Sequence, residues 1–152
     1  LAPQLEGVNM VNAPALAHER GIAVSETAHD RPCDYQSLIR LSVTTEKQTR
    51  SVAGTLFGGD KPRVVNVKGI ALEAELGRRM LYIANEDKPG LIGALGTLLG
   101  AAGINIASFH LGRLRVGGDA IALIEIDQAP EAEVLTQIRS LPQVLQAKIL
   151  IF

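Results

Sequence analysis

The sequence predicts an α+β protein from three observations: an aliphatic composition, strand patterns separated by turns in the first half, and a strand–helix order βαββαβ in the second. Apolar residues make up 47% of the 152 residues and aromatic residues 3%, so the core must consist of Leu, Ile, Val and Ala. This apolar content excludes a disordered chain. The length suits one domain or two small ones, and we expect two, at residues 1–77 and 78–152.

The first domain is predicted to be a helix followed by an antiparallel meander. The expected elements are a helix at 8–20 and strands at 22–26, 39–44, 48–57 and 63–72. Gly21 follows the helix in the position that favours a left-handed stop. Residues 39–44 alternate between apolar and polar, which predicts a half-buried strand. The turn-forming residues 58–62 separate the next two strands. These elements form a partial α+β domain.

The second domain is predicted to have the ferredoxin-like, split-βαβ order. The expected elements are strands at 80–85, 104–114, 120–127 and 144–152, and helices at 91–102 and 130–141. The first helix places one apolar stripe on its inner face, formed by Leu91, Leu95, Leu98 and Ala102. Both helices then cover one face of a four-stranded antiparallel sheet. The uncovered face, and sheet edges short of Lys and Pro, favour a dimer.

One segment between a strand and a helix carries the strongest functional pattern, Asn85-Glu86-Asp87-Lys88-Pro89-Gly90. Pro89 fixes the backbone of the first helical turn, and Gly90 allows close approach of a ligand. The free N–H groups of that turn suit a carboxylate, and Asp87 offers an anion to an ammonium group. A free α-amino acid requires both. The alternative is that Asp87 only caps the helix.

Two weaker features each have two interpretations. Asn105, at the entry to the strand 104–114, either presents its amide to a ligand or bonds the local turn backbone. Basic residues on the first domain either hold a phosphate-bearing metabolite or form a solvated strand face. These residues are Arg40, Lys47, Arg50, Lys61, Arg63 and Lys68.

No pattern indicates catalysis, metal binding or nucleic-acid binding. The single cysteine, Cys33, has no partner for a disulfide, and with His29 it supplies too few ligands for a tetrahedral metal site. A net charge of −1 argues against a nucleic-acid partner. Apolar runs fall short of the roughly 18 residues of a membrane span. Without a signal peptide at the N-terminus, we expect a cytoplasmic protein.

Several short runs of this sequence occur together in one known family. Asp87-Lys88-Pro89-Gly90, followed by Gly103-Ile104-Asn105-Ile106, resembles the ACT domain, a regulatory fold that binds amino acids. Val8-Asn9-Met10-Val11-Asn12-Ala13-Pro14 resembles the C-terminal region of the D-3-phosphoglycerate dehydrogenase family. Ala53-Gly54-Thr55-Leu56-Phe57-Gly58 is similar to a hairpin of that family's intervening, or allosteric substrate-binding, domain. The resemblance covers nearly the whole chain.

The resemblance implies a parent enzyme that oxidises 3-phosphoglycerate with NAD in the first step of L-serine synthesis. It implies no catalytic residue and no cofactor in this piece. L-Serine would sit between the ACT domains of a homo-oligomer, with Asn105 contributed by the neighbouring copy. The matching residues of the first copy are Asn85, Asp87, Lys88, Pro89, Gly90 and Leu91. Arg63 matches a basic position that would bind a phosphorylated effector, and Lys61 is a second candidate for anion binding.

Three hypotheses follow. The first is an amino-acid-sensing module that slows the parent enzyme. The second is an oligomerisation module without a ligand, which is favoured by Asn85 because the family carries His or Tyr there. The third is the regulatory part of an iron–sulfur L-serine dehydratase. A measurement of serine binding distinguishes the first two hypotheses, and the sequence upstream of Leu1 tests the third.

Overall fold

The computed structural model describes residues 7–29, 34–35 and 37–152, which belong to two compact units, Leu1–Pro32 and Cys33–Phe152. In the first unit, α1 (Ala13–Glu19) is shorter than the expected helix at 8–20. The Asn9 and Asn12 side chains accept hydrogen bonds from the N–H groups of residues 9, 11 and 12, and these bonds compete with helix formation. The strand expected at 22–26 is absent, since these residues pair with no other strand. Cys33 lies outside the described residues.

The second unit begins with an antiparallel meander in the order β1-β2-β3-β4. Its strands are β1 (Ile39–Thr44), β2 (Thr49–Phe57), β3 (Lys61–Val67) and β4 (Ile70–Glu75). The single strand expected at 63–72 is therefore two. Lys68 and Gly69 have φ values of 53° and 85°, which make a tight hairpin turn, and the Asn66 side chain accepts a hydrogen bond from the Gly69 N–H.

The edge strand β1 departs from its predicted half-buried pattern, because all six of its residues are exposed. Ile39, Leu41 and Val43 are 63–72% exposed, although they alternate as a buried face would. The alternation correctly predicted a strand, but within residues 37–152 no layer covers this part of the sheet.

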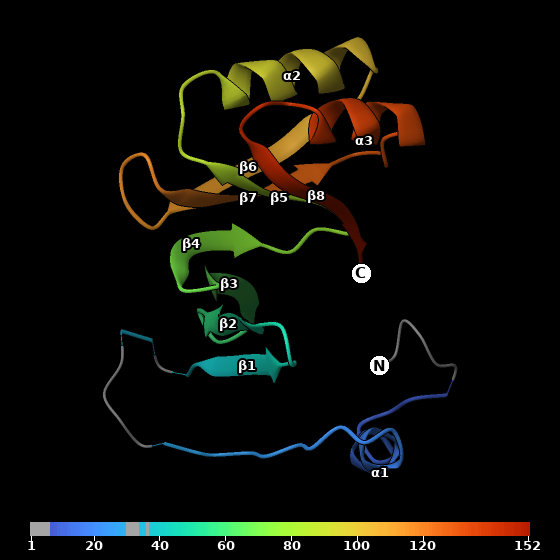
Figure 1. Ribbon diagram of the computed structural model, residues 1–152. Coiled ribbons are helices and arrows are strands. Elements are labelled where there is room, and N and C mark those ends of the chain that lie inside the picture. The colour runs from blue at the N-terminus through green and yellow to red at the C-terminus, as the bar shows by residue number, and fades with distance from the viewer. Residues whose placement is uncertain (1–6, 30–33, 36) are drawn as a thin grey trace. The chain divides into compact units, whose positions relative to one another are not determined.

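The second sheet confirms the predicted βαββαβ order, and Figure 1 shows both helices on one face of it. Its strands are β5 (Arg79–Glu86), β6 (Ile106–Arg113), β7 (Asp119–Ile126) and β8 (Val144–Ile151), and its helices are α2 (Leu91–Ala101) and α3 (Ala132–Arg139). The strand order is β6-β7-β5-β8, so β6 and β8 form the edges. The domain boundary near residue 77 remains a prediction.

The core of the second sheet lies under α2 and α3. Leu91, Leu95 and Leu99 are buried at four-residue spacing, and burial of each contributes about 1.5–3 kcal/mol. The predicted stripe was wrong in its last part, since Leu98 is only partly buried and Ala102 is exposed. Among the described residues, no helix has the length and hydrophobicity to cross a membrane.

The face of the second sheet opposite the helices packs against the first sheet, with β4 nearest (Figure 1). Met80 and Leu123 meet Val64, Leu72 and Ala74 in a second, smaller core. This packing covers much of the face that was expected to be bare, so the sequence argument for a dimer through that face loses its basis. The exposed edges of the sheet remain.

The two sheets approach each other closely at Gly112 of β6. A Cβ atom there would lie 2.3 Å from the Ala71 carbonyl oxygen of β4 and 3.0 Å from the Ile70 and Leu72 side chains. The first of these contacts is with backbone, which has no rotamer to change. Only glycine fits without moving a strand.

Gly112→Ala should therefore separate β4 from β6 and lower the free energy of unfolding by about 1–3 kcal/mol, the range typical of overpacking. Urea denaturation followed by circular dichroism measures this change. An unfolding midpoint equal to that of the wild type would contradict the close contact.

Gly100→Ala is the matched control for Gly112→Ala. Gly100 lies inside α2, and a Cβ atom there would meet nothing within 4 Å. Because alanine favours a helix interior over glycine, this variant should be more stable by about 0.5–1 kcal/mol.

Candidate ligand site

The loop between β5 and α2 is shaped by its proline and glycine. Gly90 is the N-cap residue of α2 and has φ 98°, a left-handed conformation that L-residues rarely adopt. No side chain caps the helix. The N–H groups of Leu91, Ile92 and Gly93 therefore lack partners inside the helix and carry the positive end of its dipole.

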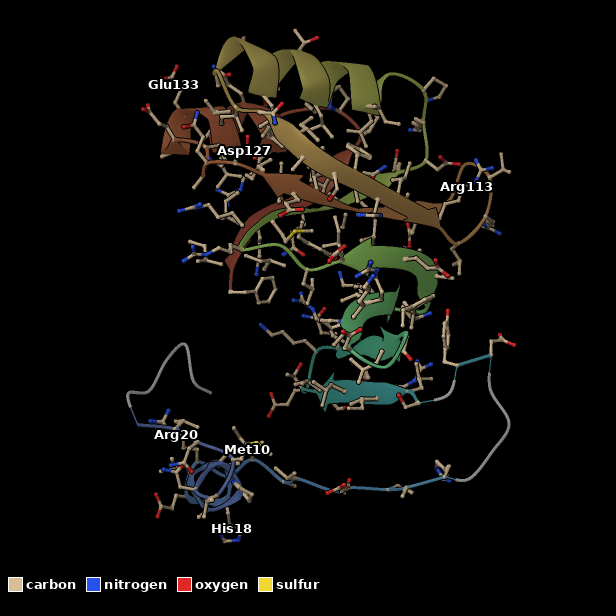
Figure 2. All side chains as sticks on the ribbon, turned by 180° about the vertical axis from the view of Figure 1, so that it is seen from behind. Met10, His18, Arg20, Arg113, Asp127 and Glu133 are labelled. Carbon is tan, nitrogen blue, oxygen red and sulfur yellow. The ribbon has the colours of Figure 1, made fainter. Side chains whose placement is uncertain are left out.

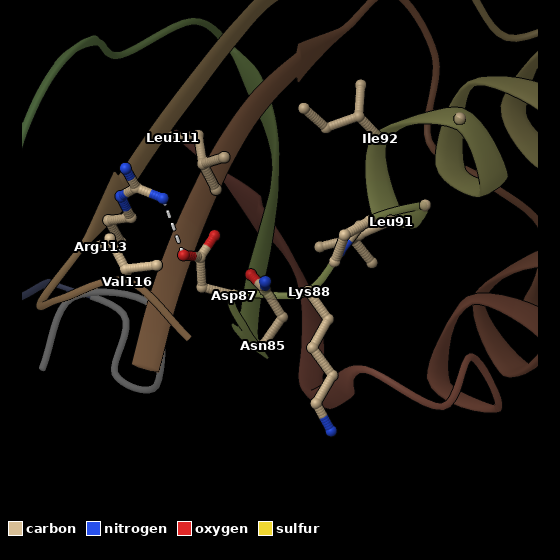
Figure 3. A pocket seen from close by; sticks show the side chains of 11 residues that line it. Asn85, Asp87, Lys88, Leu91, Ile92, Leu111, Arg113 and Val116 are labelled. Carbon is tan, nitrogen blue, oxygen red and sulfur yellow. Dashed lines mark hydrogen bonds and ion pairs between the residues drawn. The ribbon is translucent and has the colours of Figure 1, made fainter. Parts of the chain in front are cut away.

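A cavity of about 400 Å³ opens at this helix start (Figure 3). Its walls come from the end of β5, the loop, the first turn of α2, and the end of β6 with the turn that follows it. The lining residues are Asn85, Asp87, Lys88, Pro89, Gly90, Leu91, Ile92, Gly93, Leu111, Arg113 and Val116. Six of these were predicted as one group, and the structure brings that group together around the cavity.

Asp87 does not cap the helix, so that alternative was wrong. Its Oδ2 accepts hydrogen bonds from Arg113 Nη1 at 2.9 Å and from the Gly117 N–H at 3.1 Å. Its own N–H donates to the Gly118 carbonyl at 2.8 Å. The Gly117 N–H, followed by the hydrogen bond and charge of Arg113, holds the pKa of Asp87 below its usual value. The carboxylate is thus ionised and tied to the β6–β7 turn.

Asn85 is 2% exposed and has an unsatisfied acceptor. Its Nδ2 donates to the Glu86 carbonyl at 2.9 Å, while its buried Oδ1 has no partner among the described residues. A buried acceptor without a donor costs about 1–3 kcal/mol. Since Asn85 lines the cavity beside Asp87, a hydrogen-bond donor placed there would remove this cost (Figure 3).

Lys88 lines the cavity through its position in the loop, but its side chain points away from Asp87 (Figure 3). Its Nζ forms an ion pair with Glu86 Oε2 at 2.5 Å. Of the charged side chains that line the cavity, Asp87 and Arg113 are therefore the two that face each other.

Sequence reasoning missed the other five lining residues: Ile92 and Gly93 in the first turn of α2, and Leu111, Arg113 and Val116 from β6 and the turn after it. The signal was present in the topology: β5 pairs with β7 so that Glu86 lies opposite Asp119. This register brings the turn before β7 to the loop after β5. Leu111 and Val116 are 41% and 80% exposed, unusual values for apolar side chains beside a cavity.

Asn105 lies at the other end of β6 and does not reach the cavity. Its Nδ2 donates to Asp127 Oδ2 at 3.0 Å, so it bonds a side chain rather than the local turn backbone. Figure 2 shows Asp127 and Arg113 at opposite ends of the sheet. The eight residues of β6 span roughly 24 Å, which separates Asn105 from the Asp87 site within one chain.

The two basic residues predicted to bind an anion lie on β3. Arg63 forms an ion pair with Glu75 on β4 at 3.0 Å, and Lys61 is exposed at the start of the strand. Anion binding by these residues remains a prediction. In the described part of the chain, no group of three or more His, Cys, Asp or Glu side chains is arranged to hold a metal ion.

Two known family models match this chain, one in each half. Residues 1–68 match the family model of the D-3-phosphoglycerate dehydrogenase intervening domain, and residues 79–143 match that of the ACT domain. The chain is 31% identical to the D-3-phosphoglycerate dehydrogenase of Bacillus subtilis over 99% of its length, 36% identical to that of Synechocystis over 88%, and 32% identical to that of Methanocaldococcus jannaschii over 92%.

The matched region is a limited part of these relatives. The chain spans 29%, 24% and 26% of the three proteins, respectively. These matches favour a dehydrogenase over an iron–sulfur dehydratase as the relative of this sequence. An intervening-domain model and an ACT-domain model thus match the chain in succession, and the chain is homologous to the C-terminal region of the D-3-phosphoglycerate dehydrogenases.

Proposed function

We propose that this chain is the regulatory part of a cytoplasmic, NAD-dependent D-3-phosphoglycerate dehydrogenase and senses L-serine at an interface between two ACT domains. The observation that carries the proposal is the unpaired, buried Oδ1 of Asn85, a residue that lines the same cavity as Asp87 and the start of α2. Residues with acceptors and residues with unpaired N–H groups line one small space. An α-amino acid supplies the complementary groups.

The ammonium and the carboxylate group of the ligand each have complementary groups in the cavity. The ammonium group donates to Asn85 Oδ1 and to Asp87, whose Oδ1 has no hydrogen bond within the described part of the chain. The carboxylate accepts from the N–H groups of the first turn of α2. Neither end requires a metal ion or a cofactor from this chain.

A second copy completes the site through the free edge of β6. Antiparallel pairing of β6 with its own copy about Phe109 places Asn105 of the partner subunit opposite Arg113, next to Asp87. The two Asp87 and Asn105 positions, separated within one chain, then meet across the interface. The exposed Leu111, Val116 and Ile92 side chains surround the cavity and gain cover from the partner.

Regulation follows from sharing the ligand between two chains. Serine that contacts both copies binds the docked pair more tightly than the separated domains. It therefore shifts the population toward the docked state by its difference in affinity, commonly about 1–3 kcal/mol. In the parent enzyme, docked ACT domains restrain domain movement and slow the oxidation of 3-phosphoglycerate.

Isothermal titration calorimetry with L-serine tests the proposal directly, combined with analytical ultracentrifugation of the same sample. We expect saturable binding with one site per chain and a stronger dimer in the presence of serine. A dimer that takes up no serine at millimolar concentration would contradict serine sensing and support an oligomerisation module without a ligand.

Asp87→Asn should weaken serine binding about 10- to 100-fold, since it removes a charge-assisted hydrogen bond worth about 1.5–3 kcal/mol. Asp60→Asn, in the exposed turn between β2 and β3, is the matched control and should bind as the wild type does. Equal serine affinities for the Asp87→Asn variant and the wild type would place the ammonium group elsewhere.

The lowered pKa of Asp87 also fixes the pH dependence of binding. The carboxylate is ionised at every pH above its ordinary pKa of about 3.9. Serine affinity should therefore be constant from about pH 5 to about pH 8 and should fall only as the pH drops through the lower pKa that Asp87 has in the folded protein. Calorimetry across this range checks the expectation. A decline that begins near neutral pH would show that another group controls binding.

A further inference from the structure

We propose that Arg113 is a specificity-determining residue of this site and makes the cavity select ligands that carry an ammonium and a carboxylate group together. This inference rests on the proposed function and goes beyond it, because it names the residue that rejects simple amines. Arg113 belongs to neither of the two runs that resemble the ACT domain, at residues 87–90 and 103–106. It reaches the cavity from the end of β6.

The first support is the geometry of the ion pair. Arg113 Nη1 and the Gly117 N–H both bond the same oxygen of Asp87, Oδ2. This arrangement turns the carboxylate so that its other oxygen remains available (Figure 3). Arg113 thereby positions Asp87 without occupying both of its oxygens.

The second support is the exposure of the guanidinium group. The Arg113 side chain is 53% exposed, while that of Asp87 is 20% exposed. Apart from the bond to Asp87, the guanidinium has no hydrogen bond within the described residues, so it retains donors for a second anion. An arginine with spare, planar donors at the mouth of a cavity suits a carboxylate.

The third support is the charge balance of the cavity. The Lys88 charge is paired with Glu86, and its side chain points away from Asp87, which leaves the negative Asp87 and the positive Arg113 as the opposed charges (Figure 3). A neutral, dipolar site matches a zwitterion of opposite polarity. With Arg113 removed, Asp87 makes the site negative, and such a site favours cations.

The experiment compares L-serine with 2-aminoethanol, which has the same amine and hydroxyl groups but no carboxylate. We expect the wild type to prefer serine strongly. Arg113→Met should weaken serine binding about 10-fold or more and tighten 2-aminoethanol binding, so that the ratio of the two dissociation constants falls by more than 10-fold. Arg113→Lys, which restores the charge without the planar fork, should recover part of the preference.

Arg115→Met is the matched control, because Arg115 lies in the turn that directly follows Arg113 but does not line the cavity. This variant should keep the wild-type ratio. An unchanged ratio in Arg113→Met, with serine still bound by the wild type, would overturn the role of Arg113 and leave the proposed function intact. Failure of the wild type to bind serine would instead overturn the proposed function, and this inference with it.

Discussion

The pairing of β5 with β7 is the constraint on which the candidate site depends. Its register sets Asn85 opposite Ala120 and Glu86 opposite Asp119, so the loop that leaves β5 and the turn that enters β7 emerge side by side. The Asp87 carboxylate then reaches Arg113 and Gly117 across a sequence separation of up to 30 residues. Neither the helix start nor the turn has this geometry alone. A one-residue slip of β7 would turn every side chain of that strand to the other face and move the turn away from the loop.

Local sequence was sufficient to predict the limits of elements that are bounded by Pro and Gly. Pro89, Gly90 and Gly103 marked the limits of α2, and Gly90 and Gly103 have the left-handed backbone that glycine permits. Lys68-Gly69 is also a turn signal, but the Val-rich run around it was interpreted as one continuous strand. The expected strand at 22–26 failed for a different reason: a strand exists only with a partner, and local sequence does not contain the partner.

The sequence predicted only part of the candidate site. Asp87 and Gly90 lie on one loop, where residue spacing alone places them together. Arg113 comes from another strand and needs the register of the sheet. The unpaired Asn85 Oδ1 needs still more, since whether an amide finds a partner depends on burial and on every neighbour around it. The sequence thus predicted site residues that are close to one another along the chain. It missed Arg113, which the pairing of the strands brings to them.

Gly112 and Arg113 are consecutive residues at the end of β6. One of them touches the backbone of β4 with no room for a methyl group, and the next one holds Asp87. The backbone that carries Arg113 to the cavity is therefore the same backbone that contacts β4. Because packed interfaces do not deform continuously, even a small displacement there has no slack to absorb it. A shift of the β6 backbone at Arg113 would therefore be passed through Gly112 to β4.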